Sequence, residues 1–170
     1  NIRTHDIATL GLWGPKAVNA LGNFIDPNEI DIQNFPFVTA KNLTLNLSGG
    51  KKVDVWAARI SYVGESGWEI YFNNNKDDGL ALYDSLLEVG VVPVGIETYA
   101  NSRRLEKSFR LQGADLETEY TAIEAAIQRP LVKEADFHGK TAHLSHREED
   151  PCAILCTMTL DDLNVSGVPR

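Results

Sequence analysis

The sequence predicts an α+β fold, in which an antiparallel sheet carries helices on one face in the βαβββα order of a ferredoxin-like layer. Two observations lead to this prediction. Between residues 43 and 72, three segments have the β-branched and aromatic composition of strands, and short glycine-containing turns separate them. Apolar residues at helical spacing follow the first predicted strand, and a second such stretch follows the last one.

The predicted elements follow in order along the chain. Strands are predicted over residues 6–13, 43–47, 53–62 and 68–72. After the first strand, Gly14 and Pro15 turn the chain into a helix over residues 16–21, with Pro15 at a first helical position. The loop that follows contains Pro27 and Pro36, and Ser48 to Gly50 form a turn. The three later strands therefore form an antiparallel meander.

Two further helices are predicted after the meander. Asp77 and Asp78 are candidate N-caps of the first, and Gly90 ends it. We expect one side of this helix to pack on the sheet, and that side carries Leu80, Tyr83, Leu86 and Leu87. The second helix is predicted over residues 95–107, and its expected core side carries Ile96, Tyr99, Ala100 and Leu105.

This order of elements suggests three parts. Residues 1–92 are predicted to form an α+β subdomain, residues 93–150 a more irregular helical segment that completes it, and residues 151–170 the start of a C-terminal β-barrel. The barrel begins with a predicted strand from Pro151 through Leu160. Because nothing closes that barrel, we expect the chain to be part of a longer protein.

Composition excludes several classes of function. The chain has 170 residues, of which 43% are hydrophobic and 24% charged, as in ordinary globular proteins. Its net charge of −8 argues against binding to nucleic acid or to an anionic membrane, since both reward a basic patch. The sequence has neither a spanning apolar run nor a secretory signal. We expect an intracellular protein, in the cytoplasm or alternatively in the mitochondrial matrix.

The cysteines do not predict a metal site. Cys152 and Cys156 fall on one side of the predicted final strand, roughly 13 Å apart, which is too far for a disulfide or for shared ligation of one ion. His143 and His146 precede them, but the combined spacing fits no closed zinc pattern. No metal is therefore expected.

The most informative segment is Tyr62-Val-Gly-Glu-Ser-Gly-Trp-Glu69. Gly64 and Gly67 supply the backbone freedom of a tight connection between two strands. In the second strand, Trp68 falls on one face and Glu69 on the other, so Glu69 either faces water or lines a pocket. From spacing alone, an ordinary glycine-rich hairpin with an outward carboxylate is the more common structure.

Four segments in order resemble the glycine-cleavage T-protein family of folate-dependent aminomethyltransferases. They are Leu12-Trp-Gly-Pro-Lys16, Arg59 to Glu69, Asn101-Ser-Arg-Arg-Leu-Glu-Lys107 and Ala135-Asp-Phe-His-Gly-Lys140. The resemblance is closest to the C-terminal folate domains of sarcosine and dimethylglycine dehydrogenases, which share the Gly-Trp-Glu ending and the Arg-Leu-Glu-Lys helix.

The resemblance implies a tetrahydrofolate site. Glu69 corresponds to the family residue that holds the pterin ring, and a carboxylate can accept the ring N–H and the neighbouring amino group as a charge-assisted pair. Tyr62 corresponds to a residue that lines the folate cleft, and Arg104 to one that contacts the pterin region or steadies the carboxylate. Glu65 is expected to be a solvated turn residue. The family's catalytic acid corresponds to a position upstream of Asn1, so no catalytic residue is expected in this chain.

The resemblance also implies a reaction. The parent protein is expected to transfer a one-carbon unit to tetrahydrofolate from an amine such as sarcosine, dimethylglycine or an aminomethyl-lipoyl group. FAD would bind only in an upstream domain, since this chain has no Gly-x-Gly-x-x-Gly segment. Two alternatives remain: a tetrahydrofolate-dependent demethylase of the dimethylsulfoniopropionate type, and a non-enzymatic regulatory homologue. The expected partners are folate and a small amine.

Overall fold

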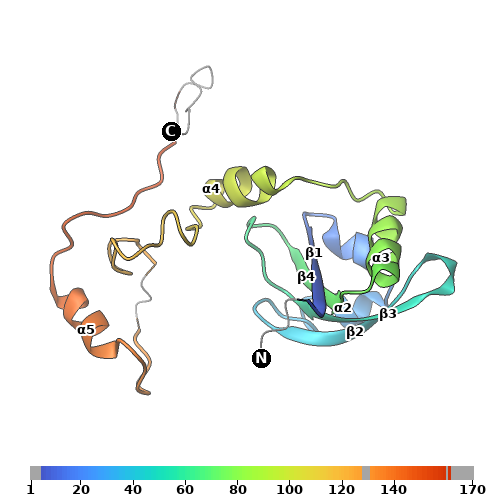
Figure 1. Cartoon of the computed structure of the whole chain (residues 1–170), viewed down its shortest axis with the longest axis horizontal. Helices are drawn as coiled ribbons and strands as arrows, with labels where there is room; N and C mark the ends of the chain where they lie inside the picture. Colours follow the sequence, from blue (N-terminus) through green and yellow to red (C-terminus); the bar gives the residue numbers. More distant parts are fainter. Residues whose placement is uncertain (1–4, 128–130, 160, 162–170) are drawn as a thin grey trace. The chain divides into compact units, whose positions relative to one another are not determined.

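The structure is a computed structural model that describes residues 5–127, 131–159 and 161 (Figure 1). Contacts within the chain divide it into two units, residues 1–107 and residues 108–170, and each is described by itself. The first unit contains a four-stranded sheet, and the described part of the second contains a helix, α5, Lys140–Glu148. The sheet and its helices confirm the predicted α+β class.

The sheet has the strand order β1-β4-β3-β2, and every neighbouring pair is antiparallel. Its strands are β1, Ile7–Trp13, β2, Ala40–Asn46, β3, Lys52–Ala58, and β4, Gly67–Asn73. The predicted strands coincide with these, although β3 ends at Ala58 rather than at Tyr62. The meander of β2, β3 and β4 is therefore closed on one side by the first strand of the chain.

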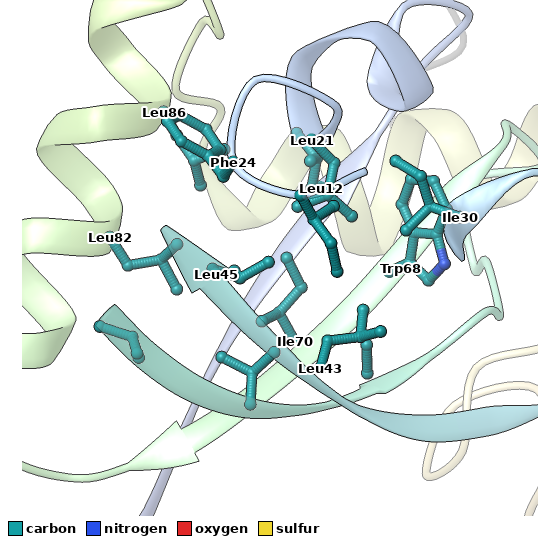
Figure 2. Packing of buried hydrophobic residues seen from close by; sticks show 14 of the residues in the cluster. Leu12, Leu21, Phe24, Ile30, Leu43, Leu45, Trp68, Ile70, Leu82 and Leu86 are labelled. Atoms are coloured by element: carbon teal, nitrogen blue, oxygen red, sulfur yellow. The ribbon is translucent and has the colours of Figure 1, made fainter. Parts of the chain in front are cut away.

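One face of the sheet is buried, and alternate residues of each strand supply it. Trp68 and Ile70 of β4 and Leu45 of β2 are completely buried. The helices α1, Ala17–Leu21, and α3, Lys76–Glu88, contribute side chains to the same core. Figure 2 shows Leu82 and Leu86 of α3 among the buried side chains that cover the strands. These two helices thus pack on one face of the sheet, and the opposite, outer face is called the free face below.

Two helix starts differ from the sequence prediction. The helix α1 begins at Ala17 with Lys16 as its N-cap, so Pro15 precedes the helix instead of occupying its first turn. The predicted loop after it contains a short helix, α2, Pro27–Ile30, where the Asp26 side chain accepts a hydrogen bond from the Asn28 backbone N–H. This cap and the fixed φ of proline explain the extra turn of helix.

The helix α3 also buries a different side from the one predicted. Its N-cap is Asn75, whose side chain accepts a hydrogen bond from the backbone N–H of Asp78, and Gly90 ends it with a φ of 86°. Leu82 and Leu86 are buried, whereas Leu80, Tyr83 and Leu87 are exposed. The reason is Gly79: a Cβ there would lie 3.3 Å from Phe72, so this side of the helix can approach the sheet closely.

The predicted helix over residues 95–107 forms as a π-helical segment, η2, Thr98–Arg103, followed by α4, Arg104–Glu106. Its predicted apolar side is partly wrong, because Ile96 and Leu105 are exposed. A π-helix has a wider turn than an α-helix, and the spacing of 3.6 residues no longer identifies one face. Tyr99 and Ala100, which were predicted on this side, are half-buried, and Arg104, which was not, is buried.

A buried arginine holds the loop after α2. The Nη1 of Arg59 donates to the carbonyl oxygens of Ile30, Asp31 and Phe35 at 3.0, 3.0 and 2.7 Å. Its guanidinium also lies 5.0 Å from the ring centre of Trp68, and burial lowers the pKa of Arg59. These contacts attach the loop to the end of β3.

In the second unit, residues 151–159 form no strand, so the predicted strand after Pro151 is wrong over those positions; Leu160 lies outside the described residues. Arg110 instead holds this extended segment by donating to the carbonyl oxygens of Ala125 and Leu155 at 3.0 and 2.8 Å. Cys152 and Cys156 are exposed, free thiols. In the part of the chain that the structure describes, no helix is long and apolar enough to cross a membrane.

The buried side of α3 can be tested with a matched pair of substitutions in the full chain. Leu82→Ala should lower the free energy of unfolding by about 2 to 5 kcal/mol, because it leaves a cavity under a completely buried side chain. Leu80→Ala, on the exposed side, should change it by less than about 1 kcal/mol. Urea unfolding measures both values, and equal losses for the two variants would contradict the observed orientation of α3.

Candidate functional site

The free face of the sheet carries a carboxylate and several aromatic rings. Glu69 and Tyr71 lie on this outer face of β4, opposite the buried Trp68 and Ile70, and both are half-buried. Across the sheet, Glu69 pairs with Gly11 of β1 and with Ala58 of β3. Neither neighbour has a side chain longer than a methyl group, so larger side chains from other positions can lie beside Glu69.

The hydroxyl of Tyr71 donates a hydrogen bond to Oε2 of Glu69. This bond, with contributions from burial and from the negative charge of Glu69, raises the pKa of Tyr71 to about 12. The indole of Trp56, which is opposite Tyr71 in β3, lies against the phenol ring with the ring centres 5.0 Å apart. Tyr71 is thus fixed on one side by a ring and at its tip by Glu69.

Trp13 occupies the other side of Glu69. A Cβ atom on Gly11 would lie 2.0 Å from the Trp13 indole, so the ring lies over this glycine on the outer face. The indole Nε1 donates to the carbonyl oxygen of Ile60 at 3.0 Å, which fixes its orientation. Gly11 is the cross-strand partner of Glu69, and because it has no side chain, the indole ring of Trp13 can lie over it.

Two tyrosines extend this wall. Tyr99 of η2 stacks on Trp13 with the ring centres 5.1 Å apart and the planes inclined by 24°. Tyr62, which lies in the connection between β3 and β4, packs against Tyr99 at 5.4 Å. Burial raises the pKa of Tyr99, and the charges of Glu69 and Tyr62 add to the shift. Tyr62 thus contacts Tyr99, whose pKa also responds to the charge of Glu69.

Arg104 is buried and follows Tyr99 by five residues on the same helical segment. Its Nε donates to the carbonyl oxygen of Ala100 at 2.6 Å. The ring contacts described above join Tyr62, Tyr99 and Trp13. Arg104 follows η2 directly in the chain, and η2 carries Tyr99.

Two depressions border this group. A shallow groove of about 870 Å³ crosses the outer face, and Tyr71, Trp56, Asn42, Thr44 and Asp54 contribute to its lining. A smaller cavity of about 150 Å³ is lined by Gly11, Trp13, Tyr99 and Arg103, among others. Glu69 lines neither of these two depressions, but Tyr71, to which it is bonded, lines the groove, and Gly11, its partner in β1, lines the cavity.

This arrangement suits a flat, polar ligand. An ionised carboxylate accepts hydrogen bonds only, and it has about four acceptor positions, of which the Tyr71 hydroxyl uses one. The remaining positions can accept two neighbouring N–H groups of a ring edge. The aromatic side chains nearby can contact the faces of such a ring.

The sequence predicts Tyr62, Glu69 and Arg104 as site residues and did not single out Trp13, Tyr71 and Tyr99, which the structure places near Glu69 and Tyr62. A signal was present for Trp13, because a glycine inside a strand often marks the close approach of another group, and Gly11 has that position in β1. Tyr71 shares a strand face with Glu69, so alternation alone would have paired them. Nothing in the sequence indicated the π-helical turn that carries Tyr99.

The fold is thus an α+β domain with a carboxylate among aromatic rings on one face of its sheet. The chain belongs to the family described as the GCVT N-terminal domain, whose sequence model matches residues 1–134. The predicted resemblance to the glycine-cleavage T-protein family is therefore confirmed.

The relatives come from two groups of proteins. The chain is 33% identical to human mitochondrial dimethylglycine dehydrogenase over 96% of its length, and it covers 19% of that protein. It is 31% identical to an aminomethyltransferase of a Geobacillus species and 34% identical to that of Staphylococcus carnosus, and it covers 44% and 42% of them. The chain thus spans less than half the length of these curated relatives.

The bond between Tyr71 and Glu69 can be tested by alkaline titration. Because the folded-state pKa of Tyr71 is raised from the usual 10 to about 12, the stabilisation is complete below pH 10 and is lost as the pH rises from 10 to 12. Phenolate absorbance of the wild type minus that of Tyr71→Phe reports this group alone. In Glu69→Gln the titration should move toward pH 10. A Tyr71 titration near pH 10 in the wild type would contradict the bond.

Proposed function

We propose that this chain is the tetrahydrofolate-binding part of an aminomethyltransferase-like protein. Glu69 accepts hydrogen bonds from the N–H and amino groups of the pterin edge, and Tyr62 lines the cleft beside it. Arg104 supports the same region from the helix that follows Tyr99. The observation that carries the proposal is the Glu69 carboxylate on the free sheet face, between Tyr71 and the stacked rings of Trp13 and Tyr99.

The residues present fit such a ligand. The pterin edge offers two neighbouring donors, which matches an acceptor-only carboxylate that keeps free positions beside the Tyr71 hydroxyl. The flat ring system matches a wall of aromatic side chains, of which Tyr62 and Tyr99 are half-buried and packed together. Membership of the GCVT N-terminal domain family supports the same ligand.

In the proposed reaction the intact protein transfers a one-carbon unit from an amine to tetrahydrofolate, which supplies the nitrogens that accept the unit. The role of this chain is orientation: Glu69 fixes the pterin edge, and the aromatic side chains exclude water from one side of it. The name of one group of relatives suggests dimethylglycine as the donor, and the sequence resemblance adds sarcosine and an aminomethyl-lipoyl group as candidates.

The proposal is tested by calorimetry with tetrahydrofolate on the intact protein. Glu69→Gln should weaken binding by about 1.5 to 3 kcal/mol, because it removes hydrogen bonds to a charged acceptor. Asp84→Asn, which neutralises an exposed carboxylate on α3 away from the site residues, should change binding by less than about 0.5 kcal/mol. Equal affinities for wild type and Glu69→Gln would rule out this assignment of the pterin site.

A further inference from the structure

Tyr71 forms a hydrogen bond with the Glu69 carboxylate that can fix the orientation of that group. It follows Glu69 by two residues on β4, so both side chains leave the strand on the same outer face. Its hydroxyl donates to Oε2 of Glu69, and its ring is half-buried. This bond selects one orientation of the carboxylate among those that a glutamate side chain can adopt.

The two cross-strand neighbours of Glu69 have no side chain that could hydrogen-bond its carboxylate. Gly11, its partner in β1, has no side chain, and Ala58, its partner in β3, has only a methyl group. Without Tyr71 the carboxylate would retain more rotational freedom, which a ligand would have to remove on binding. The Tyr71 hydroxyl removes part of that freedom in advance.

Tyr71 is itself held in place. Trp56 is its cross-strand partner in β3, and the two rings lie 5.0 Å apart with an interplanar angle of 55°. Contacts of this kind between aromatic side chains on one sheet face stabilise their relative position. Trp56 of β3 therefore contacts the phenol ring of Tyr71, and the Tyr71 hydroxyl in turn binds the Glu69 carboxylate.

We propose that Tyr71 is a positioning residue, which orients the Glu69 carboxylate toward its ligand while Trp56 holds the phenol. This inference rests on the proposed function, since it takes Glu69 to bind the pterin edge of tetrahydrofolate. Tyr71 acts through Glu69 and does not touch the ligand. The hydroxyl also leaves the other carboxylate oxygen, Oε1, free to accept from the pterin.

A double-mutant cycle on the intact protein tests this role, with tetrahydrofolate as the probe. Tyr71→Phe keeps the ring against Trp56 and removes only the hydroxyl. It should weaken binding by about two- to twelvefold in the wild type, the cost of ordering one side chain. In the Glu69→Gln background the same change should have less than about half this effect on a logarithmic scale, because its partner is altered.

A matched control comes from Tyr83→Phe, which makes the same chemical change on the exposed side of α3 and should leave the affinity unaltered. Urea unfolding of each variant separates binding from folding. A merely structural role for Tyr71 would weaken stability and affinity together, and equally in both backgrounds of the cycle.

Each result of the cycle is decisive. An equal loss of affinity from Tyr71→Phe in both backgrounds would overturn the proposal: with unchanged stability it would mean that Tyr71 contacts the ligand itself, and with reduced stability that its role is structural. If Glu69→Gln weakened binding and Tyr71→Phe did not, the positioning role would be wrong and the proposed function would stand. If Glu69→Gln had no effect, both would be wrong. A loss that depends on Glu69 supports the role of Tyr71.

Discussion

The pairing of β1 with β4 is the constraint on which the rest of the structure depends. Gly67 begins β4 with a φ of 152°, and a Cβ there would lie 1.9 Å from the carbonyl oxygen of Leu12. Next to it, the N–H of Gly14 donates to the carbonyl oxygen of Ser66 at 2.9 Å. Close backbone approach at this end fixes the register, and a shift of one residue would send Trp68 outward and Glu69 into the core.

Once the register is fixed, the site is assembled from distant parts of the sequence. β4 supplies Glu69 and Tyr71, β1 supplies Gly11 and Trp13, and the π-helical segment supplies Tyr99. The sheet therefore performs two tasks with alternate residues of the same strands. Its inner residues bind the helices through apolar contacts, and its outer residues hold a polar group among aromatic rings.

Alternation along a strand is a local property, and it was enough to predict the strands and to place Trp68 and Glu69 on opposite faces. Choosing the buried side of α3 required tertiary information, since Leu80 and Leu82 are equally apolar and the close approach of Gly79 to Phe72 exists only in the folded chain. The position of Tyr99 required the hydrogen-bond pattern of η2, because residue spacing distinguishes a π-helix from an α-helix only weakly.

The residues that can replace Gly11 depend on the residue at position 13. Its φ is not in the positive range that favours glycine, so the backbone would accept other residues, and what excludes a side chain is the Trp13 indole that occupies its place. The requirement for glycine is therefore conditional. A larger residue at this position would be tolerated in a descendant that had already lost the indole, and the two positions should change together as a pair.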